Sequence, residues 1–235
     1  MLCKIADLIT NVPEVGDLVP RCQDYLTEET AGADIIIRTD DFRPNAWHPL
    51  TGDAYIYCES GTHFHFQLLK FDGMMLHSSA VVVDGKAYLF SAPSGTGKST
   101  HTRLWQTIHG AKAEIINDDK PALRCIDGVW YAYGTPWCGK DGININKKAP
   151  VAGICFLKQA PENKIRRLSN AEAVQNIVWQ TLRRFKQTES LDRMLTNVDS
   201  LVRTIPVFEL ENRPEKEAAM LSYETMRRAA EEAGL

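Results

Sequence analysis

The segment Ala92-Pro93-Ser94-Gly95-Thr96-Gly97-Lys98-Ser99 constrains the fold of this chain more than any other feature. It matches the phosphate-binding P-loop pattern, with alanine at the position usually held by the first glycine. Such a loop joins a strand to a helix, and its small residues let backbone N–H groups converge on a phosphate. Lys98 can then reach the outer phosphates, and the Ser99 hydroxyl can bind Mg²⁺. The alternative interpretation is an ordinary glycine-rich turn before a helix.

The residues on both sides of the loop supply the strand and the helix that the pattern requires. Residues 81–83 and 87–90 are predicted as strands, and Asp84-Gly85 between them is a strong hairpin signal. Residues 100–109 have the composition of a helix, with Gly110 as its C-terminal cap. Because the strand before the loop is half of an antiparallel hairpin, the order argues against a βαβ-wound nucleotide-binding domain.

The expected fold is therefore a mixed α/β fold, in which a mixed β-sheet carries an embedded P-loop and is followed by C-terminal helices. One domain is expected over residues 1–235, with a strand-rich part (1–70), a P-loop core (71–160) and a mainly helical part (161–235). Further strands are predicted at residues 34–38, 54–58, 63–69, 113–117, 122–126, 129–133, 151–158 and 205–210. Further helices are predicted at residues 170–186, 190–201 and 214–233.

Composition narrows the class of protein. The net charge of −3 gives no indication of a nucleic-acid surface, and the basic clusters 164–167 and 183–186 are short. Arg183 and Arg184 could reach a phosphate, although a solvated helix face is favoured. The six cysteines form no Cys-x-x-Cys pair, so neither a zinc site nor a redox site is expected. With no signal-peptide pattern and no membrane-length apolar run, a cytoplasmic protein is expected.

Two adjacent acids follow a predicted strand in Asn117-Asp118-Asp119-Lys120. A P-loop enzyme needs a carboxylate near Mg²⁺ and a group that orients or deprotonates the attacking atom. Neighbouring side chains at a strand end diverge, so Asp118 and Asp119 could divide these tasks. The alternative is a solvated turn, since these residue types also favour turns.

Other candidate residues are a lysine and three histidines. Lys140 lies in the glycine-punctuated loop 134–142 and could neutralise charge on a transferred phosphoryl group, or could simply be exposed. His77 precedes the hairpin. His63 and His65 would share one face of a predicted strand, which permits a metal pair, although packing or surface exposure is favoured.

In this order, Leu76-His77-Ser78, residues 91–100 and residues 115–120 resemble the catalytic domain of HPr kinase/phosphorylase. More distantly, the P-loop resembles that of phosphoenolpyruvate carboxykinases. The resemblance implies the corresponding C-terminal-domain fold and a kinase that transfers the γ-phosphoryl group of ATP to a hydroxyl, commonly a serine, with Mg²⁺.

The resemblance also assigns roles to residues of this chain. Asp118 resembles the general base, His77 resembles an active-site histidine close to the acids, and Lys98 belongs to the phosphate cradle. The metal-holding pair corresponds to Ser99 and Asp119. The nucleotide-binding segment comprises Ala92, Pro93, Ser94, Gly95, Thr96, Gly97, Lys98, Ser99 and Thr100.

Two departures from the family pattern bear on the acceptor. Ser78 stands where the family usually has glycine, and the family's later segment with a reactive arginine is not found, the loop around Lys140 being the candidate for its place. These departures favour a serine in a peptide or protein, a free amino acid or another small hydroxyl compound over HPr. The rivals are a nucleotide-binding regulatory module and an NTPase without an acceptor. The amphipathic C-terminal helix could pack on its own core or on a second subunit.

Overall fold

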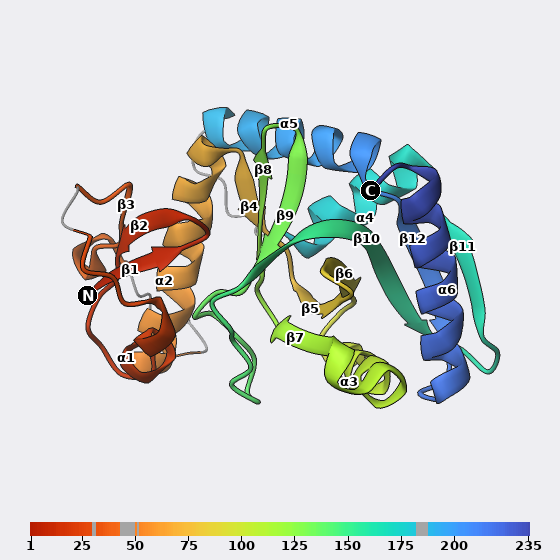
Figure 1. The fold of residues 1–235 in the computed structure, drawn as a ribbon. Helices are drawn as coiled ribbons and strands as arrows, with labels where there is room; N and C mark the ends of the chain where they lie inside the picture. Colours follow the sequence, from red (N-terminus) through yellow and green to blue (C-terminus); the bar gives the residue numbers. More distant parts are fainter. Residues whose placement is uncertain (30–31, 43–49, 51, 182–187) are drawn as a thin grey trace.

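The computed structural model describes residues 1–29, 32–42, 50, 52–181 and 188–235. The N-terminal part is a small sheet beside a long helix (Figure 1). The sheet consists of β1 (Leu2–Ile5), β2 (Leu8–Asn11) and β3 (Ile35–Ile36), and the helix is α2 (Gly52–Leu68). Short helical turns complete this part: α1 (Leu18–Arg21), η1 (Gln23–Tyr25), η2 (Thr39–Asp41) and η3 (Leu69–Phe71).

A large mixed sheet forms the rest of the molecule. Its main path runs in the order β4 (Gly73–Met75), β8 (Ala122–Ile126), β9 (Val129–Tyr133), β10 (Lys148–Gln159), β6 (Lys86–Ser91), β5 (Ser78–Val83) and β7 (Ala113–Asn117). Off this path, β12 (Val207–Asn212) pairs with β10, and β11 (Lys164–Arg167) pairs with β12. The expected mixed α/β architecture is confirmed.

Strand β10 joins the two halves of this sheet. Its first residues pair antiparallel with β9, whereas the rest pairs parallel with β6 and β12. The strand before the P-loop, β6, therefore lies between antiparallel β5 and parallel β10. This arrangement differs from a βαβ-wound domain, as the hairpin signal predicts.

Helices cover both faces of the sheet (Figure 1). On one face, α3 (Lys98–His109) and α6 (Lys216–Glu232) pack together, and Trp105 and Met226 enter a shared apolar core. On the other, α4 (Asn170–Gln180) and α5 (Thr188–Thr204) bury Ile177 and Leu201 against the sheet. The turn η4 (Gly110–Lys112) follows α3. No helix in the described part of the chain is both long and apolar enough to cross a membrane.

The strands predicted at residues 54–58 and 63–69 are wrong, because residues 54–58 and 63–68 belong to helix α2 and Leu69 begins the turn η3. The buried positions Phe64 and Leu68 recur at helical spacing. Gly61 is not a turn residue: it lies in mid-helix, where an added Cβ would meet the Trp137 ring at 2.9 Å. The short apolar runs of this segment fit either periodicity, and tertiary packing selects the helix.

Most of the other predicted strands and helices are present in the structure. Both hairpin turns, at Asp84-Gly85 and Asp127-Gly128, have the positive φ angles that their tight turns require. Helix α4 ends at Gln180, and its N-terminal cap is Ser169 with a capping box. The predicted continuation through Arg183 and Arg184 lies outside the described residues. The basic cluster 164–167 is strand β11, a strand that the sequence pattern does not predict.

Replacing Gly134 with alanine is expected to destabilise the fold strongly. A Cβ at this position would lie 1.9 Å from the backbone oxygen of Ile145 and 2.7 Å from that of Ile116, and neither oxygen can rotate away. We expect a loss of roughly 3 kcal/mol in the free energy of unfolding, measured by urea denaturation. Gly32→Ala is the control, because a Cβ there meets nothing within 4 Å. Equal midpoints for the two variants would contradict the expectation.

Candidate active site

The register of three strands brings the sequence motifs to one edge of the sheet. Strand β5 runs antiparallel between β6 and β7, so β6 and β7 both end where β5 begins. Ser78 pairs with Ser91, and Ala80 pairs with Asn117. The glycine-rich loop after β6, the acids after β7 and His77 before β5 therefore lie at the same edge.

The predicted P-loop has the required strand–loop–helix context. It leaves β6 after Ser91, and α3 begins at Lys98. Gly95 and Gly97 have φ angles of 80° and 117°, which disfavour any residue with a side chain. The Lys98 ammonium is largely buried and donates a hydrogen bond of 3.0 Å to the Ala92 carbonyl. Burial lowers the pKa of Lys98, although Asp119 opposes the shift.

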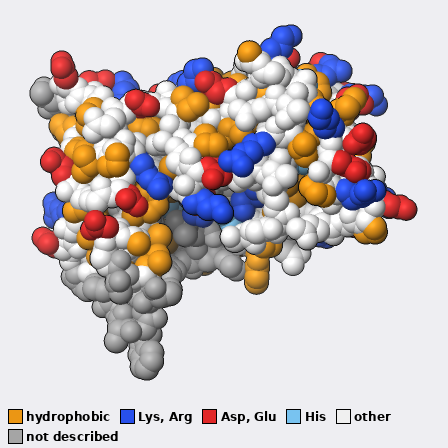
Figure 2. All heavy atoms as spheres, turned by 90° about the horizontal axis from the view of Figure 1, so that it is seen from below, with side chains coloured by type: hydrophobic (Ala, Val, Ile, Leu, Met, Phe, Trp, Pro, Cys, Tyr) orange, Lys and Arg blue, Asp and Glu red, His pale blue; other side chains and the backbone are white. Residues whose placement is uncertain are grey.

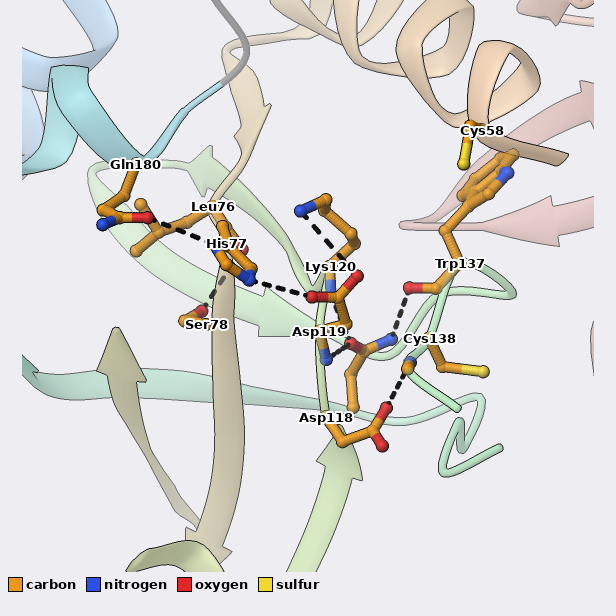
Figure 3. Close-up of polar contacts among 12 residues, drawn as sticks. Cys58, Leu76, His77, Ser78, Asp118, Asp119, Lys120, Trp137, Cys138 and Gln180 are labelled. Carbon is orange, nitrogen blue, oxygen red and sulfur yellow. Dashed lines mark hydrogen bonds and ion pairs between the residues drawn. The ribbon is translucent and has the colours of Figure 1, made fainter. Parts of the chain in front are cut away.

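His77 lies between an amide and a carboxylate (Figure 3). Its Nε2 is 3.1 Å from Asp119 Oδ1, and its Nδ1 is 3.1 Å from the side-chain oxygen of Gln180. A protonated ring can donate to both oxygens. A neutral ring can keep its donation to Asp119 if the Gln180 amide turns over and donates to Nδ1. The His77 ring is therefore held between the end of α4 and the Asp119 carboxylate.

Asp119 is an ionised carboxylate surrounded by cationic groups. Burial raises its pKa, but the hydrogen bond from His77 and the charges of Lys120 and Lys98 outweigh this effect and hold the pKa below its usual range. Lys120 Nζ is 3.7 Å from Asp119 Oδ2. The charge of Lys98 couples the acid electrostatically to the lysine at the end of the glycine-rich loop.

Asp118 points the opposite way, towards the loop that contains Cys138 (Figure 3). Its Oδ1 accepts a hydrogen bond of 2.6 Å from the Gly139 backbone N–H. Burial raises the pKa of this carboxyl, despite the hydrogen bond. An added Cβ at Gly139 would lie 2.9 Å from Asp118 Oδ2, so the close approach depends on glycine. The pKa values of the two adjacent acids are thus shifted in opposite directions.

The N-terminal part of the chain holds the loop that faces Asp118. The Tyr57 hydroxyl accepts hydrogen bonds of 2.7 Å from the Cys138 N–H and from Arg21, and lies 2.9 Å from the Cys138 carbonyl, to which it donates. Arg21 also donates to that carbonyl at 3.1 Å. Helices α1 and α2 therefore fix the backbone that presents the Gly139 N–H.

Sequence reasoning missed three residues of this site: Asn117, Lys120 and Gln180. The Asn117 side-chain oxygen accepts from the backbone N–H groups of Asp119 and Lys120, at 2.9 and 2.7 Å. Asn117 and Lys120 flank the two acids in the sequence, and this position could have identified them as site residues. No local pattern identifies Gln180, because it lies 103 positions from His77 in the sequence and reaches it only through packing of α4.

Lys140 is exposed, and among the described residues no side-chain contact joins it to the acids. Its loop is nevertheless tied to the P-loop helix, since Arg103 of α3 donates to Asp141 at 2.9 Å. Figure 2 shows a group of Lys and Arg side chains near the middle of the face seen from below. Such a local excess of positive charge attracts anions, although the net charge of the chain is −3.

The histidines of α2 do not form the metal pair that a strand would have allowed. His65 is fully buried, and its Nδ1 accepts from the Met75 backbone N–H at 2.9 Å. Burial lowers its pKa to about 3, so the ring is neutral and structural. Among the described residues, no group of three or more His, Cys, Asp or Glu side chains could hold a metal ion.

A pocket of about 290 Å³ opens between the glycine-rich loop and His77. Pro93 and Ser94 form one wall, and His77 and Lys120 face it. The other lining residues are Met75, Trp179, Gln180 and Thr181. The pocket therefore contacts both the glycine-rich loop and the groups around Asp119.

The fold and the site together define a mixed α/β protein in which a strand–glycine loop–helix unit lies beside paired carboxylates. The chain belongs to the family described as "SynChlorMet cassette protein ScmC", whose model matches residues 62–213. No curated protein matches the chain. A solved structure, the Hpr(Ser) kinase/phosphatase from Coxiella burnetii, is similar at 14% identity and a TM-score of 0.37, over 66% of this chain and 88% of that one. This structural likeness is distant.

Proposed function

We propose that this chain is an ATP-dependent kinase that transfers the γ-phosphoryl group to a hydroxyl with Mg²⁺. The observation that carries the proposal is that the glycine-rich loop, with its buried lysine, lies at the same sheet edge as two carboxylates. The pKa of one carboxylate is raised and the pKa of the other is lowered. Phosphoryl transfer depends mainly on positioning and charge stabilisation, and these groups supply both.

The two acids suit different tasks. A general base works best when its pKa is closer to the working pH, which fits the raised pKa of Asp118. The lowered pKa of Asp119 fits a carboxylate that stays ionised beside positive charge. In the proposal Asp118 accepts the proton of the acceptor hydroxyl, and His77 keeps Asp119 oriented.

The donor set fits a magnesium ion held jointly by protein and nucleotide. Mg²⁺ is commonly bound by one or two protein oxygens together with substrate phosphates and water. The Ser99 hydroxyl and the Asp119 carboxylate would provide the protein oxygens, and the ion would neutralise charge on the phosphates when bound. Lys98, with Lys140 as a second candidate, would stabilise charge on the transferred group.

The pocket between Pro93 and His77 would bind the body of the acceptor, and the acceptor hydroxyl would reach past Asp119 towards Asp118, which does not line this pocket. Because that pocket is small and open, it fits a serine side chain, a free amino acid or another compact hydroxyl compound. Lys120 and His77 would offer positive or hydrogen-bonding groups to such a molecule.

The test is incubation of the purified protein with γ-labelled ATP, Mg²⁺ and pooled serine-containing peptides, amino acids and small hydroxyl compounds. Label in an acceptor is the expected result. Release of inorganic phosphate alone would instead favour an NTPase, and tight nucleotide binding with neither outcome would favour a regulatory module. Omission of Mg²⁺ is the control and should abolish transfer.

A further inference from the structure

Helix α2 anchors the loop that faces Asp118 by its tryptophan. Trp137 Nε1 donates a hydrogen bond of 2.9 Å to the Ser60 hydroxyl, and the Trp137 ring stacks on Phe64 with the ring centroids 4.7 Å apart. Both Trp137 and Ser60 are buried. Figure 3 shows Trp137 beside the helix and Cys138 beside Asp118. The residue that precedes Cys138 is therefore fixed to the N-terminal part of the chain.

Tyr57, on the same helix, holds the next residue of the loop. Its hydroxyl accepts a hydrogen bond of 2.7 Å from the Cys138 N–H and donates to the Cys138 carbonyl at 2.9 Å. The Pro136 carbonyl is farther from the hydroxyl, at 3.2 Å. Because a hydroxyl has one hydrogen to donate, the shorter distance favours Cys138. One side-chain oxygen thus binds both backbone polar groups of a single residue.

Arg21 of α1 completes a clamp on this residue. Its Nη1 donates to the Tyr57 hydroxyl at 2.7 Å and to the Cys138 carbonyl at 3.1 Å, and its guanidinium lies 4.6 Å from the centre of the Tyr57 ring. The backbone carbonyl of Arg21 accepts from the Asn144 side chain at 2.8 Å, which ties α1 to the chain just beyond the loop. Hydrogen bonds donated by a cation are roughly twice as strong as those between neutral groups. The Cys138 carbonyl is therefore held firmly.

The held carbonyl determines where the next N–H points. The Cys138 carbonyl and the Gly139 N–H belong to one peptide unit, which is planar and trans, so the two groups point in opposite directions. Tyr57 and Arg21 bind the carbonyl on one side, and on the other side the N–H meets Asp118 Oδ1 at 2.6 Å. The clamp thus decides which group of the peptide faces the carboxylate.

Gly139 itself offers little resistance to a turn of this peptide. Glycine adopts positive and negative φ angles with similar ease, and a side chain is excluded here by the approach of Asp118. If the peptide turned over, the Cys138 carbonyl oxygen would face a carboxylate oxygen, and neither of these two acceptors could donate a hydrogen bond. The direction of the peptide is therefore set from outside the loop.

We propose that Tyr57 is a positioning residue for phosphoryl transfer, which holds the Cys138 carbonyl so that the Gly139 N–H is directed at Asp118. This inference rests on the proposed function, and it adds the N-terminal part of the chain to the machinery that orients the base. The hydrogen bond from Gly139 restricts rotation of the carboxylate, and a base must point at the acceptor hydroxyl to receive its proton. Tyr57 acts through the peptide and does not itself take the proton.

The experiment is a double-mutant cycle of Tyr57→Phe and Asp118→Asn, measured as single-turnover transfer of labelled phosphate to the acceptor pool described above. Tyr57→Phe keeps the ring but loses both hydrogen bonds to Cys138. It should lower the rate of transfer roughly 10- to 100-fold and leave the calorimetric Kd for Mg·ATP unchanged. In the Asp118→Asn protein the same change should have no further effect, because the group through which Tyr57 acts is already lost.

Tyr133→Phe is the matched control. It removes the same atom, and the Tyr133 hydroxyl also joins the large sheet to the N-terminal part, by donating to Asp7 at 2.8 Å. Because Asp7 lies outside the loop, transfer by this variant should be unchanged. Arg21→Met removes the other donor to the Cys138 carbonyl and should act in the same direction as Tyr57→Phe. Unfolding temperatures of all variants show whether any loss comes from misfolding.

Amide hydrogen exchange of Gly139, followed by NMR in the unliganded protein, tests the clamp without any reaction. Exchange should be roughly tenfold faster in Tyr57→Phe than in wild type or Tyr133→Phe. Unchanged exchange, unchanged transfer by Tyr57→Phe, or an equal loss of transfer in both halves of the cycle would overturn the positioning role. If the wild-type protein transfers no label, the proposed function fails, whereas faster Gly139 exchange would still support the hold of Tyr57 on the peptide.

Discussion

Asp118→Asn is expected to lower phosphoryl transfer by orders of magnitude while nucleotide binding persists. Asparagine can still accept the hydrogen bond from the Gly139 N–H, but it cannot accept a proton from the acceptor hydroxyl. Loss of a general base commonly lowers the rate by roughly 10²- to 10⁴-fold. The measurements are single-turnover transfer of labelled phosphate and the calorimetric Kd for Mg·ATP.

The control is Asp127→Asn, the same change in charge at a hairpin turn, where asparagine-glycine is as favourable as aspartate-glycine. Near-full transfer by Asp118→Asn would refute the assignment of the base. If Asp119→Asn lost transfer with binding intact and Asp118→Asn did not, the roles of the two acids would be exchanged.

The same residue sets an expected pH dependence. A base acts when deprotonated, so transfer should fall as the pH drops through the pKa of Asp118. Burial places that pKa above the ordinary aspartate value of 3.8, so the decline should begin at a higher pH than an exposed aspartate would give. The residual activity of Asp118→Asn should lack this decline.

Lys98→Met is expected to weaken binding of Mg·ATP and of tripolyphosphate alike. The ammonium donates a hydrogen bond to the Ala92 carbonyl and would donate to the phosphate oxygens of a bound ligand. Loss of about 2–3 kcal/mol corresponds to a rise in Kd of roughly 30- to 150-fold. Calorimetry measures the change.

The control for this variant is Lys112→Met, in the turn after the far end of α3. Methionine keeps much of the apolar stem of lysine, so the fold should persist in both variants, which unfolding temperatures would verify. Unchanged affinity of Lys98→Met for both ligands would show that the loop does not bind phosphate.

Local signals predicted the central part of the fold well. Aspartate-glycine pairs fixed both hairpins, because few other pairs adopt their positive φ angles at low cost. The glycine loop and Gly110 fixed the two ends of α3. The segment that became α2 misled the same reasoning: its Gly61 resembles a turn residue but packs against Trp137, a contact across the fold that no local pattern records.

The residues of the candidate site fall into two groups, those that a local sequence motif reveals and those that only the folded chain brings to the site. Lys98, Asp118 and Asp119 were identifiable because they belong to short contiguous motifs whose chemistry is local. Gln180 was not, and neither was the clamp of Arg21 and Tyr57 on the loop facing Asp118, since all three reach the site from distant elements. The sequence could also not show that the two acids point in opposite directions.

By itself, the sequence determined a glycine-rich loop between a strand and a helix, the hairpin before it and the acids after the next strand. These features depend on backbone conformations that particular residues prefer over a few positions. Only the tertiary structure decided that the three motifs meet, because strand register sets which residues lie opposite one another. It also decided the electrostatic character of the acids, since burial and the approach of His77, Lys98 and Lys120 come from packing.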